Sequence, residues 1–177
     1  MRKVLFFLMF IFASFTYGQR LSVLGIKMGT SIEDAEKLLK ERYGEYEIHR
    51  KGLTELKTYN ALVGGSEFHN VSFEFQVARY ETVAYTFLYY VELQKNFRSY
   101  KSAKSMFNVW EERLLDKYTV EDVKRITKPG QREQEETVFF KEGVCLELTY
   151  SESKGGESFW YVIISYYEDI IGQSSDY

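Results

Sequence analysis

Two carboxylates, Glu74 and Glu147, occupy matching places in two short apolar stretches, VSFEF at 71–75 and VCLEL at 144–148. In each stretch the glutamate alternates with apolar residues, so we expect it mid-strand, on the face opposite the apolar row. Two carboxylates that face each other across a sheet could divide the acid and base roles of a hydrolase. The simpler interpretation is that they keep the outer face of a sheet soluble.

Few other residues are candidates for a catalytic or metal-binding role. Cys145 is the only cysteine, so no internal disulfide is expected, and its neighbours Val144 and Leu146 indicate a buried strand thiol. His49 and His69 lie on different expected elements, which does not resemble the spacing of metal ligands. The sequence contains no phosphate-binding loop, dinucleotide-binding glycine motif, nucleophile elbow or zinc-protease motif. We therefore predict no catalytic residues, no metal site and no cofactor.

The first 18 residues have the pattern of a secretory signal peptide. Arg2 and Lys3 form a short basic start, an apolar run follows at 4–15, and small residues stand at Thr16 and Gly18. We predict cleavage after Gly18 and export to the periplasm or the exterior; the alternative is an uncleaved N-terminal anchor. No later segment stays apolar for about 18 residues, so no membrane span is expected in the mature chain.

The charge of the mature chain excludes one class of partner. Without Arg2 and Lys3, 21 of the 23 basic residues remain against 26 acidic ones. This acidic excess argues against nucleic acid as a partner, because binding to phosphates needs a basic surface. Residues 19–177 are enough for one domain, or for two small halves that share a core.

Two helices are predicted from apolar residues at helical spacing. The first follows Gly29, begins at a cap formed by Thr30 or Ser31, and ends at Gly44. The second runs from about 99 to 117. The apolar stripes, expected to face the core, are Ile32, Ala35, Leu38, Leu39 and Tyr43 in the first helix, and Ala103, Met106, Phe107, Trp110, Leu114 and Leu115 in the second.

After each helix the spacing of apolar residues becomes alternating, and turn residues such as Gly64-Gly65 separate the alternating segments. The expected strands are 46–50, 54–59, 71–77 and 82–93 after the first helix, and 119–126, 136–140, 144–150 and 159–168 after the second. The sequence therefore predicts an α+β fold of two helix-plus-antiparallel-sheet repeats, 19–95 and 96–177. The repeats would form one compact unit, with the helices on one face of the sheet.

Two stretches resemble a known group of proteins. LGIKMGTSIEDAEKLLKERYG (24–44) is similar to the opening of small secreted proteins of unknown function from gut-commensal bacteria, and WEERLLDKYTVED (110–122) is similar to their second helix. Those proteins close on a strand that ends in Tyr-x-Asp, as the chain closes on Tyr166-Tyr167-Glu168-Asp169. The resemblance implies a tandem-repeat beta-lactamase-inhibitor-protein-like fold, with helices on one face and a concave sheet on the other. The chain lacks that inhibitor's disulfide-forming cysteines, and the resemblance implies no target.

The last strand of each half has apolar or aromatic residues on both faces. We align AYTFLYYVEL (84–93) with WYVIISYYED (160–169) at an offset of 76. The residues expected to face the helices are Tyr85, Phe87, Tyr89 and Val91 in the first strand, and Tyr161, Ile163 and Tyr167 in the second. The expected outer row is Ala84, Thr86, Leu88, Tyr90 and Glu92, with Trp160, Val162, Ile164, Tyr166 and Glu168. A slip of one residue reverses this assignment. In another alternative both rows are buried.

An exposed aromatic sheet face is typical of interaction sites. The leading hypothesis is therefore a non-catalytic binding module, not an enzyme, that recognises a protein or peptide. The candidate contact residues are Trp160, Tyr166, Ile164, Tyr90, Leu88, Glu74 and Glu147. One alternative is an envelope scaffold that self-associates as a homodimer through the same face. Another is a hydrolase that uses Glu74 and Glu147.

Overall fold

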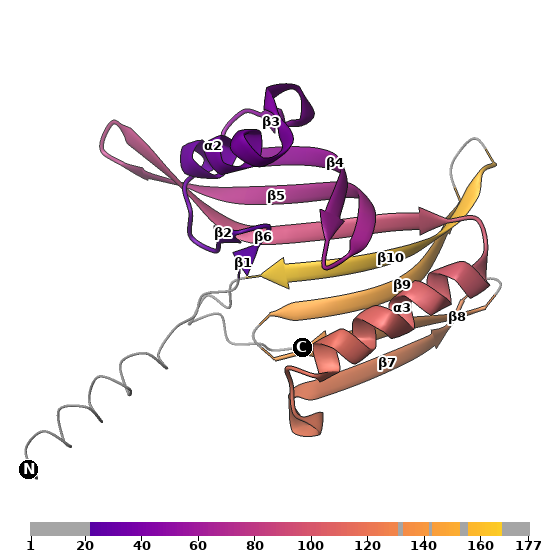
Figure 1. The fold of residues 1–177 in the computed structure, drawn as a ribbon. Helices are drawn as coiled ribbons and strands as arrows, with labels where there is room; N and C mark the ends of the chain where they lie inside the picture. Colours follow the sequence, from indigo (N-terminus) through magenta and orange to yellow (C-terminus); the bar gives the residue numbers. More distant parts are fainter. Residues whose placement is uncertain (1–21, 131–132, 142, 153–155, 168–177) are drawn as a thin grey trace, which may run out of the picture.

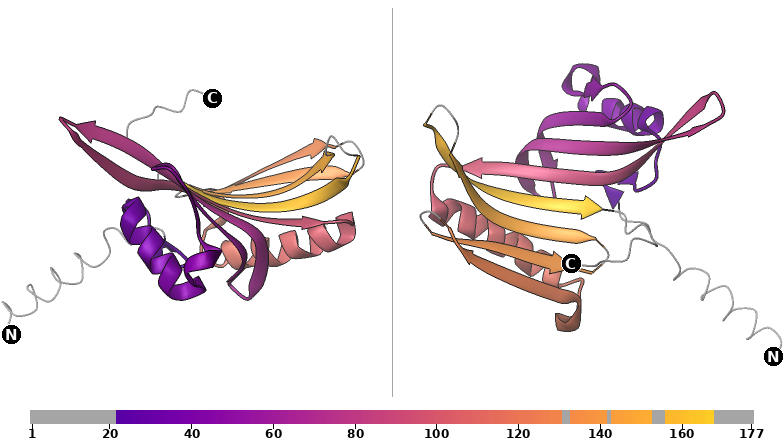
Figure 2. Two further views of the ribbon diagram at one scale, coloured as in Figure 1. Left: turned by 90° about the horizontal axis from the view of Figure 1, so that it is seen from above. Right: turned by 180° about the vertical axis from the view of Figure 1, so that it is seen from behind.

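The computed structural model of the protein describes residues 22–130, 133–141, 143–152 and 156–167; the predicted signal peptide at 1–18 and Glu168 lie outside them. An eight-stranded antiparallel sheet forms the body of the molecule. Helices α2 (Ile32–Tyr43) and α3 (Tyr100–Leu115) both pack on one face of it (Figure 1, and Figure 2, left). The predicted α+β class is confirmed. Within the described ranges, no helix is long and apolar enough to cross a membrane.

The two longest strands lie near the middle of the sheet. The small hairpin of β1 (Ser22–Val23) and β2 (Ile26–Lys27) precedes α2. The strands after α2 are β3 (His49–Lys51), β4 (Glu55–Val63), β5 (Ser66–Tyr80) and β6 (Val83–Phe97), and those after α3 are β7 (Val123–Pro129), β8 (Gln134–Phe140), β9 (Val144–Glu152) and β10 (Ser158–Tyr167). Their order across the sheet is β3-β4-β5-β6-β10-β9-β8-β7. Because β6 pairs with β10, one sheet runs through both halves of the chain.

Both helices begin at a serine cap. The Oγ of Ser31 accepts a hydrogen bond from the backbone N–H of Asp34 at 3.2 Å, and Ser99 does the same for Ser102 at 3.2 Å. These bonds satisfy backbone donors that the first helical turn leaves without a partner. The first helix ends at Gly44, as predicted. The second predicted helix is also confirmed, with ends that differ by one or two residues.

Strands β5 and β6 are longer than predicted and extend beyond their neighbours as a two-stranded arm (Figure 1). The pairing of β4 with β5 ends at Glu74, and the pairing of β10 with β6 ends at Tyr90. Beyond those points, residues 76–80 and 83–87 pair as strands only with each other among the described residues. We call residues 76–87 the arm.

The helix-facing side of the sheet is apolar across its whole centre. Directly opposed residues of an antiparallel sheet lie on the same face. Val71, Leu93, Ile164, Leu146 and Val138 form one such opposed row from β5 to β8, and all five are fully buried. This row is the floor on which the apolar faces of the helices pack.

The predicted facing is correct for Tyr90, Val91 and Glu92 on β6, but it is wrong for β10 and for the part of β6 that precedes Tyr90. Trp160, Ile164 and Leu88 were expected on the outer face, but they lie on the helix-facing side and are at most 4% exposed. The ring of Trp160 packs 4.9 Å from that of Tyr100 on α3, measured between centroids. Tyr166 also faces the helix side. Trp160, Ile164 and Leu88 are core residues, Tyr166 is half-buried against the core, and none of the four forms an open surface on the outer face.

The physical reason for this difference is a β-bulge in β6. Glu74 pairs with Tyr90 but the next pair is Phe75 with Leu88, so Tyr89 is an extra residue on β6. A bulge shifts the alternation of side chains by one residue. It places Leu88 and Val91, three positions apart, on the same buried face.

The bulge also explains why an offset of 76 carries the wrong face from the end of β6 to β10: it takes Tyr90, which points away from the helices, to Tyr166, which lies on the helix side. An offset of 73 takes Val91 to Ile164, both on the helix-facing side. The same offset takes Glu74 to Glu147 on the opposite side. An odd change in the offset reverses every side chain along the strand.

Candidate functional site

The face of the eight-stranded sheet that points away from α2 and α3, which we call the open face, is polar along its centre. Ser72, Glu92, Ser165 and Cys145 form a directly opposed row across β5, β6, β10 and β9. No helix among the described residues covers this face (Figure 2, left). Ser72, Ser165 and Cys145 are nevertheless buried.

Two consecutive tyrosines on β6 also lie on the open face. The hydroxyl of Tyr89 donates a hydrogen bond to Glu74 Oε2 at 2.9 Å, and the hydroxyl of Tyr90 donates to Glu92 Oε2 at 2.9 Å. Tyr90 Oη also lies 3.1 Å from Ser165 Oγ on β10. The bulge brings both tyrosines to the open face, since neighbours on a regular strand would point to opposite faces. We call these five residues the tyrosine–carboxylate cluster.

The open face continues from this cluster along the arm. Gln76 lies two positions beyond Glu74 and is opposed by Phe87, and Ala78 is opposed by Tyr85. Alternation therefore places these residues on the open face. Tyr80 and Tyr85 near the tip are 70% and 55% exposed. The result is a continuous row, which we call the aromatic strip, made of Tyr80, Tyr85, Phe87, Tyr89 and Tyr90.

The electrostatics of the cluster keep its phenols protonated. The hydrogen bond to Glu74 raises the pKa of Tyr89, and burial raises it further. Burial raises the pKa of Tyr90, and the negative charge of Glu92 adds to that rise against an opposing effect of Ser165. Phenols of raised pKa act as hydrogen-bond donors at neutral pH rather than as bases. The cluster is thus a fixed set of donors and acceptors on a partly covered surface.

Cys145 is a buried thiol, as predicted. Burial raises its pKa to about 12, with a further contribution from the charge of Glu147. The Sγ atom donates to Glu147 Oε1 at 3.7 Å. A thiol with so high a pKa is almost entirely protonated at neutral pH and is therefore a poor nucleophile.

The two glutamates of the paired-carboxylate hypothesis are far apart. Both lie on the open face, but Glu74 is on β5 and Glu147 is on β9, with β6 and β10 between them. The register also offsets them by four residues along the strands. With strand spacings of about 4.8 Å and a rise of about 3.4 Å per residue, their Cα atoms are roughly 20 Å apart. Paired glycosidase carboxylates are within about 10 Å of each other.

The histidines form no site together. His49 stacks edge-on against Tyr59, with ring centroids 5.3 Å apart, and His69 hydrogen-bonds Asn96. Within the part of the chain that the structure describes, no group of three or more His, Cys, Asp or Glu side chains could hold a metal ion.

The structure thus places three of the seven candidate residues, Tyr90, Glu74 and Glu147, on the open face. Sequence reasoning missed Tyr89 and Ser165, and it assigned Tyr85, Phe87 and Tyr89 to the core. The available signal was an interruption in the alternation of apolar residues along β6. On β5, the buried residues Val71, Phe73 and Phe75 recur every second position. On β6, three positions separate Leu88 from Val91, and two separate Val91 from Leu93. Such a gap between strand residues indicates a bulge.

No protein-family model, no curated protein and no solved structure matches the chain.

Proposed function

We propose that the chain is an exported, non-catalytic binding module that holds a protein or peptide on the aromatic strip of the open face. The observation that carries this proposal is the exposure of Tyr80 and Tyr85 in a continuous row with Tyr89 and Tyr90. Tyrosine provides a large contact area at a low cost in side-chain entropy, which is why it recurs in binding hot spots.

The arm gives the strip a recognition mechanism. Residues 76–80 of β5 and 83–87 of β6 pair with each other but with no further strand of the described sheet. An extended segment of a partner can add to such an edge through backbone hydrogen bonds, while alternate side chains contact the aromatic rings. The carboxylates of Glu74 and Glu92 at the inner end of the strip favour a partner with Lys or Arg there.

A self-associating scaffold is the weaker alternative. A second copy of the chain docked on the same face around a twofold axis would bring Glu74 and Glu92 toward their own equivalents. Like charges at the centre of an interface oppose association. This alternative predicts that the mass measured by sedimentation rises with protein concentration and that Tyr85→Ser removes this rise. Such a result would favour self-association over binding of a different protein.

We also propose that the two halves are repeats, which would agree with the resemblance to the tandem-repeat beta-lactamase-inhibitor-protein-like fold. Three features support this. Each half has one helix followed by four strands. Each helix begins at a serine cap, Ser31 or Ser99. A single offset of 73 relates Glu74 to Glu147 and Val91 to Ile164, and the two residues of each pair lie on the same face of the sheet.

The binding proposal is tested with peptides selected on the protein. Peptides from a displayed random library are selected on the wild type and measured against a Tyr80→Ser/Tyr85→Ser double variant. We expect affinity to fall about tenfold or more, because two aromatic anchors are removed. Leu38→Ser, which removes a 45% exposed apolar side chain from α2 on the other side of the sheet, should leave affinity unchanged. Peptides that bind the double variant as tightly as the wild type contradict the proposal.

A further inference from the structure

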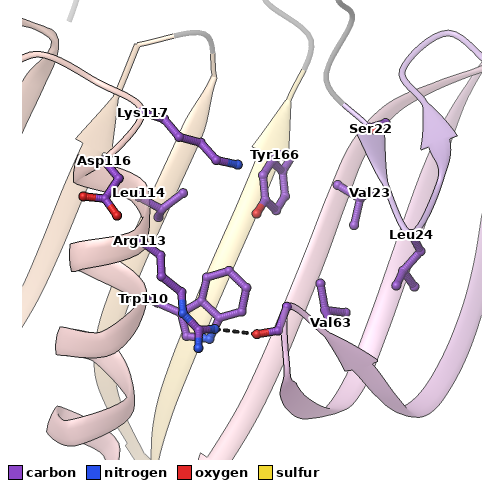
Figure 3. Close-up of a pocket in the computed structure, with 11 residues that line it drawn as sticks. Ser22, Val23, Leu24, Val63, Trp110, Arg113, Leu114, Asp116, Lys117 and Tyr166 are labelled. Carbon is purple, nitrogen blue, oxygen red and sulfur yellow. Dashed lines mark hydrogen bonds between the residues drawn. The ribbon is translucent and has the colours of Figure 1, made fainter.

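A cleft of about 470 Å³ lies on the helix side of the sheet, away from the aromatic strip (Figure 3). It is bordered by β1, by the turn between β4 and β5, and by the C-terminal end of α3, and Tyr166 of β10 lies at its base. Its volume is in the range of pockets that bind small molecules. Its walls include Val23, Val63, Trp110 and Leu114.

One wall of the cleft is rigid and aromatic. Trp110 donates from Nε1 to Ser66 Oγ at 3.2 Å, and its ring packs 5.6 Å from that of Phe68 between centroids. The guanidinium of Arg113 lies 5.2 Å from the Trp110 ring centroid and donates to the carbonyl of Gly64 at 2.6 Å (Figure 3). These contacts fix the indole face before any ligand arrives, which lowers the entropic cost of binding.

Polar donors converge at the other end of the cleft. Figure 3 shows the side chain of Lys117 extending toward the ring of Tyr166, whereas the Asp116 carboxylate points away from the cleft. Burial raises the pKa of Tyr166 to about 12, so its hydroxyl is protonated at neutral pH. An ammonium and a phenol together can each donate to one carboxylate.

We propose that this cleft is a binding site for a small amphipathic carboxylate, whose headgroup contacts Lys117 and Tyr166 and whose apolar body lies along Trp110 and Val63. Lys117 and Arg113 supply two positive charges, and Asp116, the only acidic residue among the described residues that line the cleft, is turned outward. This charge balance selects an anion over a cation of the same shape. The site is independent of the aromatic strip, because it lies on the opposite side of the sheet.

The test uses three probes with the same apolar chain: dodecanoate, dodecanol and dodecyltrimethylammonium. The two ionic probes are titrated calorimetrically below their micelle concentrations, and dodecanol is titrated below its solubility limit. We expect dodecanoate to bind the wild type more tightly than either other probe. Lys117→Gln should weaken dodecanoate about tenfold and leave dodecanol unchanged, because only the charged headgroup loses a contact. Lys101→Gln, the same change near the opposite end of α3, should have no effect.

Two further variants locate the site. Tyr166→Phe should weaken dodecanoate a few-fold without changing dodecanol, and Val63→Trp, which fills the cleft, should abolish binding of all three probes. Equal binding of the three probes, or dodecanoate binding that Lys117→Gln leaves unchanged, would mean an apolar contact without headgroup recognition and overturns the proposal. Failure of dodecanoate to bind the folded wild type also overturns it.

Discussion

Tyr90 on β6 and Ser165 on β10 lie with their hydroxyl oxygens 3.1 Å apart, and this contact joins the two halves of the chain on the open face. The same phenol donates to Glu92 at 2.9 Å. The Tyr90 side chain therefore positions both Glu92 and Ser165 where β6 pairs with β10.

Replacing Tyr90 by Phe should therefore destabilise the fold by about 1 kcal/mol, since it removes a donor to a carboxylate on a partly covered surface. Urea unfolding measures this difference. Tyr85→Phe makes the same chemical change on an exposed ring and should leave the midpoint unaltered. Equal losses in the two variants would contradict a structural role for the Tyr90 hydroxyl.

Stability should fall at alkaline pH. Burial raises the pKa of Cys145 from 9.0 to about 12 and that of Tyr166 from 10.0 to about 12. Because the folded pKa values are the higher ones, the stabilisation is fully present below about pH 9 and is lost as pH rises toward 12. The unfolding midpoint in urea should thus be lower at about pH 11 than at about pH 8, and Tyr166→Phe should reduce the difference. A pH-independent midpoint would contradict this.

Cys145 should be inert in the folded protein. Its burial and its raised pKa both suppress the thiolate. A thiol-specific reagent should label it only in denaturant, as followed by intact mass. Rapid labelling at neutral pH without denaturant would show that this part of the open face opens easily.

The turn between β4 and β5 should tolerate no side chain at Gly64. Its φ is +54°, and a Cβ would lie 2.9 Å from Trp110 Cη2. Gly65 has a φ of +75° but no atom within 4 Å of such a Cβ. Gly65→Ala should cost about 1 kcal/mol for its backbone conformation, and Gly64→Ala should cost clearly more because the indole must move. Thermal unfolding of the pair measures the difference, and equal values would contradict it.

An ion-pair network should fix the edge strand β7 to α3. Arg125 pairs with Glu111 of α3 and, at 3.1 Å, with Glu136 of β8, and Lys104 also pairs with Glu136. Both glutamates are buried, so Arg125→Met should cost about 1–3 kcal/mol by leaving buried charge without its partner. Lys124→Met, on the other face of β7, is the matched control. A loss no larger than that of the control would show that the network contributes little.

The sequence was sufficient for the helices and for the presence of the sheet, because both depend on local signals: serine caps, apolar stripes and alternating strands. It failed on the faces of the last strands, because facing depends on register. Tyr89-Tyr90 and Tyr166-Tyr167 look alike in sequence. Only the first pair contains a bulge, so its two rings share a face, whereas Tyr166 lies on the helix side.

The sequence also did not predict the full lengths of β5 and β6. The predicted strand 82–93 stopped at Leu93, while β6 continues to Phe97, and β5 begins five residues before Val71. Polar and charged residues at these ends do not alternate with apolar ones, so local patterning gives no signal there. Pairing with β4 extends β5 at this end, and pairing with β10 extends β6.

Crosslinking in the native host tests whether the open face is the binding surface. A photo-crosslinking amino acid is placed at Tyr85 on the aromatic strip and, in a separate variant, at Leu38 on α2. We expect a discrete crosslinked partner from position 85 that is absent from position 38, and we expect Tyr80→Ser to reduce the yield of this crosslink. Crosslinking to the same partner from position 38, or none from position 85 while a partner still co-purifies, would contradict the claim that the open face is the binding surface.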